Sequence, residues 1–326
     1  MEADPTKAYN QDDATVRRRL IREKFKRVLV SPKILVDGVS QDEKLRRFID
    51  LPKLFDLLKN QRLVLPKLKK LIEGDPFECS ARKKLDGFGD EQLKEQAKQL
   101  EEFAPESAKE FPYFSESTIP VFGQQISDMS PEELKKAVWY LERERLKEKL
   151  VCSCWHKGTR ESDAMWKIYA PQMGVSISSS AARMQSSITL VTPKFCAESI
   201  QLKLAAMNYG DTEECKDHEP WLIKRMAFEH EKEVRLYCDV PFMFENHIEV
   251  KIDIQKFIEE IVITPFVPRW QLSGMQGAIE ALLKEVGASQ IPVGQSKHMR
   301  APDIGWPPDQ KLLYEGFSSY LNKQSD

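Results

Sequence analysis

The chain contains 326 residues, with 49 Lys and Arg against 51 Asp and Glu, and hydrophobic residues make up 41% of it. This is enough apolar material for the core of one large domain or two modest ones. The nearly balanced charge argues against a protein that binds nucleic acid through a broad basic surface, although it is compatible with a local basic cleft. No apolar run approaches the roughly 20 residues that span a bilayer.

The cysteines and the first residues of the chain indicate a cellular compartment. Six cysteines are spread through the chain without the dense spacing of a disulfide framework. The N-terminal letters MEADPTKAYNQDD lack the basic and apolar regions of a secretory signal. We therefore predict a cytoplasmic protein with reduced thiols and without membrane association.

Residues 1–40 are predicted to form an N-terminal extension. Their basic run, RRRLIREKFKR, is more typical of a solvated helix face than of a binding patch. The apolar run that follows, VLVSPKILVDG, is expected to dock on the body of the protein through four side chains: Val28, Val30, Ile34 and Val36.

The first part of the core is predicted at residues 41–80. KLRRFID, residues 44–50, predicts a short strand, and RLVL, residues 62–65, predicts a second. Between them, LPKLFDLLKN predicts a helix with Asp50 as its N-cap and Pro52 in its first turn.

A further helix start is predicted at GDPFE, residues 74–78. Asp75 would be the cap and Glu78 the third helical residue. Capping explains both carboxylates, so we expect no further role for them.

Residues 81–149 are predicted to be a helical insertion. Ser130, Pro131 and Glu133 form a capping box at the start of SPEELKKAVWYLERERLKEKL. Apolar residues then recur at helical spacing, at Leu134, Ala137, Val138 and Leu141. A structural helical layer is the favoured interpretation.

The core is expected to resume over residues 150–298, followed by a C-terminal tail at 299–326. Alternating or apolar segments predict strands at VCSCW, GVSIS, SIQLKLAAM, VRLYCDV, HIEVKIDI and IVITP. SDAMWKIYA and residues 270–287 predict helices. Strands and helices mix without a regular βαβ rhythm. The prediction is therefore an α+β fold with a mixed, mostly antiparallel sheet, flanking helices and a helical insertion.

The segment FEHEKEVRLY, residues 228–237, carries the densest charge pattern. In a strand, Glu231, Glu233 and Arg235 would share one face, with Val234 and Leu236 on the other. Such a row suits a site where charge develops during a reaction, but it equally suits a solvated ladder in which the arginine neutralises its neighbours. Buried carboxylates would need a paired polar cleft.

The segment CSCWHK, residues 152–157, places Cys152, Cys154 and His156 on one strand face and Ser153 on the other. Further ligands at structural-zinc spacing are missing, so we predict no metal. Downstream, Trp166 and Tyr169 lie three residues apart on the predicted helix. They could form an aromatic wall, although core packing is the more common use of such a pair.

The segment LRRF, residues 45–48, supplies a candidate for anion binding. Arg46 or Arg47 could hold a phosphate or carboxylate through two hydrogen bonds, and surface exposure is the alternative. The chain has no GxGxxG, P-loop, GxSxG or HExxH signature.

The order of these segments resembles a bacterial family called domain of unknown function 2971. The matching pieces are LRRF, EGDPFE, CSCW, MWKIYA, MGVSIS and KRMAFEHEKEVRLY, and the likeness covers residues 44–80 and 150–297. Gly74 stands where the family usually has Asn, and CSCW replaces its Cys-Phe-Ser run. The family implies no reaction.

More weakly, the order of an Arg-bearing strand, a Ser-bearing strand and Glu-x-Glu is similar to the ADP-ribosyltransferase superfamily. That resemblance implies that Arg47 binds the pyrophosphate of NAD and Ser153 supports the nicotinamide ribose. It also implies that Glu233 orients the ribose and Glu231 activates an acceptor. The implied function is an NAD-dependent ADP-ribosyl transferase or NAD glycohydrolase of the toxin or defence type. Three further residues complete the candidate ligand-binding set: Trp166, Tyr169 and Arg235.

Two other functions stay open at this point. In a non-catalytic module, the same polar face would bind a nucleotide or peptide, and Trp139 and Tyr140 of the insertion would contact a partner. A metal-dependent nuclease would use four carboxylates: Asp75, Glu78, Glu231 and Glu233. The acceptor, the protein partner and the oligomeric state are left undefined.

Overall fold

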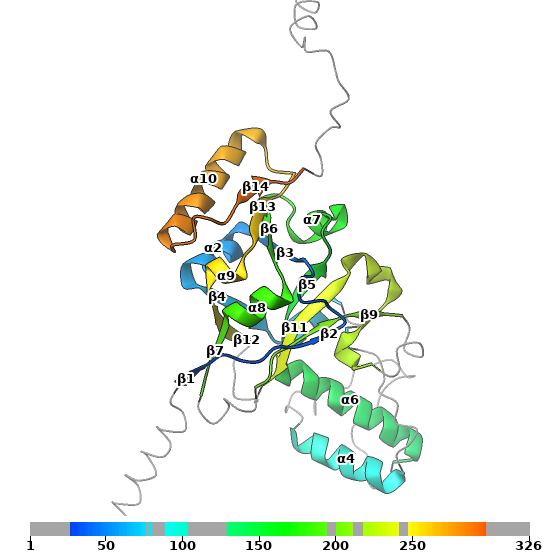
Figure 1. The fold of residues 1–326 in the computed structure, drawn as a ribbon. Coiled ribbons are helices and arrows are strands. Elements are labelled where there is room, and N and C mark those ends of the chain that lie inside the picture. The colour runs from blue at the N-terminus through cyan, green and yellow to red at the C-terminus, as the bar shows by residue number, and fades with distance from the viewer. Residues whose placement is uncertain are drawn as a thin grey trace, which may run out of the picture.

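A computed structural model describes residues 27–75, 78–79, 89–103, 129–193, 200–210, 218–240 and 247–297 (Figure 1). These residues form an α+β fold with mostly antiparallel sheets, as the sequence predicted. Over the same ranges, no helix combines the length and the apolar character that crossing a membrane requires.

The largest sheet has eight strands in the order β14-β13-β6-β3-β5-β11-β8-β2. Its neighbours are antiparallel except at the two edges, where β14 pairs with β13 and β2 with β8 in parallel. The strands are β2 (Leu35–Asp37), β3 (Leu45–Asp50), β5 (Leu150–Lys157), β6 (Gly174–Ser179), β8 (Lys203–Ala206), β11 (Glu233–Asp239), β13 (Glu260–Ile263) and β14 (Val293–Gln295).

A second sheet has four antiparallel strands in the order β1-β7-β12-β4. They are β1 (Arg27–Val30), β4 (Arg62–Pro66), β7 (Ile188–Pro193) and β12 (His247–Ile252). A short parallel pair, β9 (Asn208–Tyr209) and β10 (Ile223–Lys224), lies beside the large sheet.

The main hydrophobic core lies between the two larger sheets. Val234 and Leu236 of β11 enter it from the large sheet, and Leu190 and Val250 enter it from the small one. Four helices add side chains to the same core and cover that side of the large sheet (Figure 1): α2 (Leu51–Asn60), α8 (Ala181–Ser187), α9 (Ile254–Phe257) and α10 (Arg269–Glu285).

Helix α2 begins and ends where its sequence requires. The Asp50 side chain accepts a hydrogen bond from the Lys53 amide at 2.8 Å, with Pro52 in the first turn, as predicted. Gln61 ends the helix in the left-handed conformation, and its amide bonds the carbonyls of Leu57 and Leu58.

Part of the predicted N-terminal extension belongs to the body of the protein. β1 pairs with β7 and β2 pairs with β8. Residues 27–37 therefore contribute one strand to the four-stranded sheet and one to the eight-stranded sheet. Between these strands, the Gln185 side chain accepts from the Ile34 amide at 2.6 Å and donates to the Pro32 carbonyl at 3.0 Å. Ile34 is buried and Val36 packs against the core, as expected, whereas residues 1–26 lie outside the described ranges.

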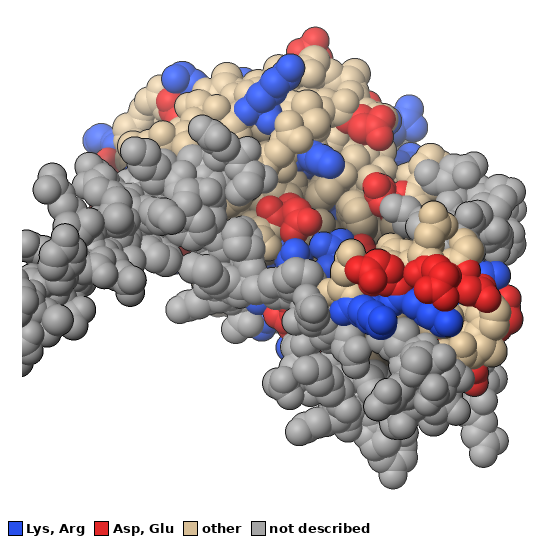
Figure 2. Space-filling view, turned by 90° about the horizontal axis from the view of Figure 1, so that it is seen from below, with Lys and Arg blue, Asp and Glu red and all other residues tan. Residues whose placement is uncertain are grey.

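The predicted insertion contains a helical pair, α4 (Asp90–Phe103) and α6 (Pro131–Lys149). The capping box at Ser130 and Glu133 is present, and the predicted apolar stripe of α6 is buried. Tyr140, which would contact a partner if the chain were a non-catalytic module, is buried in the small core between α4 and α6. Figure 2 shows acidic and basic side chains side by side over this pair, where α6 forms ion pairs such as Lys135–Glu132 and Arg145–Glu142.

The other face of the large sheet is polar in its middle and covered at its sides. Helix α7 (Asp163–Tyr169) covers one part through a cluster of Phe48, Met165 and Trp166. Helices α6 and α3 (Lys69–Gly74) cover another through a cluster that includes Cys152 and Tyr237.

The prediction that Asp75 begins a helix is wrong. Asp75 ends α3, and the Glu78 amide donates to the Asp75 carbonyl at 2.9 Å within a turn. Residues 76 and 77 lie outside the described ranges.

Candidate functional site

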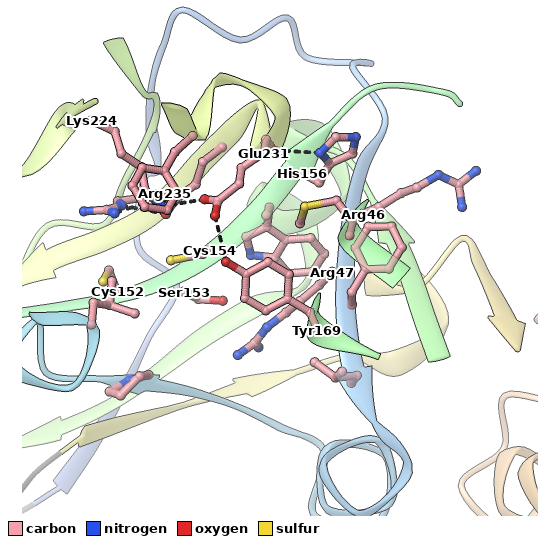
Figure 3. Close-up of a pocket in the computed structure, with 18 of the residues that line it drawn as sticks. Arg46, Arg47, Cys152, Ser153, Cys154, His156, Tyr169, Lys224, Glu231 and Arg235 are labelled. Atoms are coloured by element: carbon pink, nitrogen blue, oxygen red, sulfur yellow. Dashed lines mark hydrogen bonds and ion pairs between the residues drawn. The ribbon is translucent and has the colours of Figure 1, made fainter. Parts of the chain in front are cut away.

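A cavity of about 540 Å³ opens on the polar face of the large sheet. This size lies within the range of small-molecule sites. Its walls come from β3, β5 and the start of β11, from α7, and from the 3-10 helix η4 (Met226–Glu231) (Figure 3). The predicted site residues that line it are Arg47, Ser153, Tyr169, Glu231, Glu233 and Arg235.

The cavity extends into a gap between β3 and β5. These strands pair only at Leu45–Lys157 and Arg46–His156, and no pairing between them continues beyond Arg46. By strand alternation, Arg47 lies on the same face as the buried core residues Leu45 and Ile49. Because the strands separate beyond Arg46, the Arg47 side chain nevertheless lines the cavity.

The two glutamates reach the cavity from different elements. Glu233 begins β11, where Arg235 shares its face and Val234 points to the core, as predicted. Glu231 is not in the strand, because η4 ends there and Lys232 adopts a left-handed conformation with φ of 40°. The carboxylates of Glu231 and Glu233 nevertheless lie close together, because the turn at Lys232 brings Glu231 back over the start of β11.

Lys224 joins the two glutamates. Its ammonium donates to Glu231 Oε2 and, at 2.9 Å, to Glu233 Oε2. Lys224 ends β10, which pairs with β9, and its ammonium lies 4.9 Å from the centre of the Phe228 ring. The sequence offered an indication, because Lys224 opens the quoted segment KRMAFEHEKEVRLY, but no role was assigned to it.

Arg235 is fully buried and pairs with two carboxylates. Its Nε lies 2.7 Å from Glu233 Oε1, and its Nη1 lies 2.8 Å from Glu78 Oε1 and 2.8 Å from the Trp221 carbonyl. Arg235 is therefore a positioning group whose donors are already engaged. Contrary to the expectation that Glu78 has no role beyond capping, its buried carboxylate pairs with Arg235 at the wall of the cavity.

These contacts determine the charge of Glu233. Burial acts to raise the pKa of its carboxyl, but the charges of Arg235 and Lys224, with hydrogen bonds from Arg235 and the Cys154 thiol, lower that pKa to about 2. Glu233 is 5% exposed, so a buried, ionised carboxylate lies at the wall of the cavity.

Three further ring side chains contact the glutamates. The Tyr169 hydroxyl donates to Glu231 Oε1 at 2.8 Å, and the Tyr209 hydroxyl accepts from the Glu233 amide at 2.6 Å. His156 Nδ1 lies 2.6 Å from the Glu231 carbonyl, and burial lowers the pKa of this histidine, which favours its neutral form. Sequence reasoning assigned roles to neither Tyr209 nor His156, because their proximity depends on strand pairing.

Arg47 differs from its neighbour Arg46. Arg46 is buried, with its Nη2 3.0 Å from Glu260 Oε1, and it points away from Glu231 (Figure 3). Arg47 makes no hydrogen bond or ion pair within the described ranges. Burial lowers the pKa of Arg47, opposed by the nearby Cys154 and Cys152 thiols, although an arginine stays charged.

Ser153 and Trp166 differ in their relation to the cavity. Ser153 lies opposite Leu236 in the strand register, yet like Arg47 it lines the cavity, and its hydroxyl has no partner among the described residues. Trp166 is fully buried against Phe48 and does not line the cavity; its indole donates to Glu161 at 2.9 Å. Trp166 is thus a packing residue, and only Tyr169 of the predicted aromatic wall reaches the cavity.

The strand face of Cys152, Cys154 and His156 borders the same cavity. Within the described ranges, no group of three or more His, Cys, Asp or Glu residues is arranged to hold a metal ion. Asp75 and Glu78, considered above as metal ligands, pair instead with Arg225 and Arg235.

Charged side chains of both signs line the cavity. An ion-paired cluster of three carboxylates (Glu78, Glu231 and Glu233) and two cations (Lys224 and Arg235) carries one net negative charge. Arg47 lies outside this cluster and has no partner in the described part of the chain, and the lining also includes Arg46, Lys53, Lys70 and Asp75.

No protein-family model, no curated protein and no solved structure matched this chain. What the cavity binds therefore has to be inferred from its own side chains and charges.

Proposed function

We propose that the cavity binds NAD and that the chain is an ADP-ribosyl transferase or NAD glycohydrolase of the toxin or defence type. The supporting observation is that one cavity is lined both by Arg47, which has no partner among the described residues, and by an ion-paired carboxylate cluster with a net negative charge. NAD carries the matching charges, because its pyrophosphate is anionic and its nicotinamide ring is cationic.

The reaction breaks the bond between the ribose C1 atom and the nicotinamide nitrogen. Nicotinamide leaves with the bonding electron pair, and the ribose develops positive charge as in glycoside cleavage. Water or an acceptor group then attacks C1 and loses its proton to solvent. A fixed negative cluster stabilises the developing positive charge, and Arg47 would bind the pyrophosphate through charge-assisted hydrogen bonds.

The roles proposed for the other predicted residues follow from their placement. Glu233 supplies fixed negative charge, and Glu231 faces the reacting sugar with Tyr169 beside it. Arg235 holds Glu233 in place, and Ser153, which lines the cavity, would support the nicotinamide ribose. The proposed membership in domain of unknown function family 2971 adds no reaction to this account.

Release of nicotinamide from NAD, followed by chromatography, tests the proposal. We expect release by the wild type, a loss of at least about 100-fold in Glu233→Gln, and weaker NAD binding in Arg47→Met. Lys284→Met, which removes a charge from an exposed position near the end of α10, is the matched control and should retain full release. Equal release by the wild type and Glu233→Gln would contradict the assignment.

A non-catalytic nucleotide-binding module is the second candidate. It is favoured by the geometry of Glu233, whose two carboxylate oxygens already contact Lys224 and Arg235. A thermal-shift titration separates the candidates, because a ligand that binds the folded state raises stability with its concentration. A melting temperature that rises with NAD concentration, without release of nicotinamide, would support the binding module and exclude the enzyme.

A further inference from the structure

Among the described residues, Lys224 is the one cation that contacts both glutamates of the site. Its side chain is 10% exposed, and the exposed fractions of the Glu231 and Glu233 side chains are 7% and 5%. Two carboxylates that share a cation in so little solvent would repel each other strongly if that cation were removed. The ammonium is further fixed by the Phe228 ring, 4.9 Å away.

We propose that Lys224 is a positioning residue that keeps Glu231 and Glu233 ionised and side by side, so that both face the reacting sugar as carboxylates. The role of Lys224 in catalysis rests on the proposed function, whereas its effect on the charge of the two carboxylates is independent of that function. Arg235 cannot replace it, because Arg235 contacts Glu233 and Glu78 but forms no ion pair with Glu231 in the described part of the chain.

Among the described residues, Lys224 is the cation paired with Glu231, whereas Arg235 and Lys224 act together on Glu233. Tyr169 of α7 and Tyr209 of β9 are neutral hydroxyls, and burial raises the pKa of both. From β5, burial holds His156 towards its neutral form, and a hydrogen bond with Cys152 together with burial raises the pKa of the Cys154 thiol. Other charged neighbours among the described residues are Arg235, Glu78, Lys232 and Arg225, with Arg46 near His156 and Arg47 near Cys154; Arg225 pairs with Asp75.

The test uses the full chain with ¹³C-labelled glutamate, titrated by NMR. In Lys224→Met, which keeps most of the length of the side chain and removes its charge, we expect one carboxyl of the pair to titrate at least about two pH units higher than in the wild type. Lys224→Arg should restore the wild-type titration to within about half a unit, and Lys284→Met should leave it unchanged. The proposal would be overturned if both carboxyls of Lys224→Met titrated as in the wild type, or if Lys224→Arg showed the same upward shift as Lys224→Met.

If the Lys224→Met variant does not fold, a measurement on the wild type tests the same proposal. The ¹⁵N resonance of the Lys224 ammonium in the wild type should remain that of a protonated amine at a pH of about 10.4, where exposed lysines are half deprotonated. The charges of Glu233 and Glu231 raise the pKa of Lys224 in spite of its burial. Titration together with the exposed lysines would overturn the role of Lys224.

Nicotinamide release gives an independent readout. If the wild type releases nicotinamide, the acid limb of its pH profile should move upward in Lys224→Met by the interval seen in the NMR titration. If the wild type releases none at any pH, the proposed function fails, while the NMR titration still decides the role of Lys224.

Discussion

Arg47 and Arg46 are adjacent in the chain and have opposite environments. Arg46 is buried with Glu260 at 3.0 Å and also donates to the Thr159 carbonyl at 3.3 Å. Arg47 contacts no carboxylate within the described ranges and lines the cavity. The first arginine therefore stabilises the fold, whereas the second is available to an anionic ligand.

This contrast predicts opposite effects of the same substitution. Arg46→Met should lower the free energy of unfolding by about 1–3 kcal/mol, because Glu260 and the Thr159 carbonyl lose a partner. Arg47→Met should change it by less than about 1 kcal/mol, since no buried partner is left unpaired. Urea denaturation of both variants checks this, and a larger loss in Arg47→Met would show that Arg47 is structural.

The depressed pKa of Glu233 predicts a specific acid sensitivity. A carboxyl with a pKa of about 2 in the folded state and an ordinary value of 4.5 favours folding above pH 4.5, and this contribution is lost as the pH falls towards 2. The stabilisation is on the order of 3 kcal/mol. Unfolding free energies measured at pH 6, 4 and 3 should fall less steeply in Glu233→Gln than in the wild type, and parallel curves would contradict the ion pairing of Glu233.

At the scale of elements, the junction between α7 and β6 depends on Gly174. A methyl group at Gly174 would lie 2.3 Å from the Cβ atom and 2.5 Å from the Cα atom of Ala170. The chain thus needs glycine where α7, which carries Tyr169, turns into the central strand β6.

Gly174→Ala should lower the free energy of unfolding by about 3 kcal/mol, because the clash is with backbone that cannot move aside. Gly277→Ala is the matched control: it lies in α10, where the added methyl group would meet nothing within 4 Å apart from the neighbouring backbone of its own helix, and it should raise stability by about 0.5–1 kcal/mol. Thermal melts of both variants test the comparison. Equal melting temperatures would contradict the tight packing at Gly174.

The elements themselves were largely predictable from local patterns. Asp50 and Ser130 cap helices as predicted, and Val234 and Leu236 alternate with Arg235 as a half-buried strand requires. The exceptions arise where tertiary contacts decide. Glu231 lies in a 3-10 turn although its spacing from Glu233 fits a strand, because the chain reverses at Lys232.

At the scale of the whole molecule, the site depends on pairings that no local pattern contains. Lys224 meets the glutamates because β10 pairs with β9, and Glu78 reaches Arg235 across more than 150 residues of chain. The division of the strands into two sheets likewise depends on long-range pairing, such as β1 with β7 and β2 with β8. Sequence reasoning therefore found the residues of the strands and missed the partners that make Glu231, Glu233 and Arg235 one ion-paired cluster.

The helical pair is linked to this cluster through Glu78. Arg143 of α6 donates to the Glu78 carbonyl at 3.3 Å, and the Glu78 carboxylate contacts Arg235 at 2.8 Å. Helix α6 also continues directly into β5, which lines the cavity. The pair is thus built onto the wall of the site, in keeping with its predicted role as a structural layer.

A crystal structure of the chain soaked with ADP-ribose, the fragment of NAD that remains after nicotinamide leaves, tests the central claim most directly. We predict the pyrophosphate within hydrogen-bond distance of Arg47 and the terminal ribose C1 atom facing Glu231 and Glu233. Density for the ligand elsewhere, or an empty cavity at saturating ADP-ribose, would contradict the account.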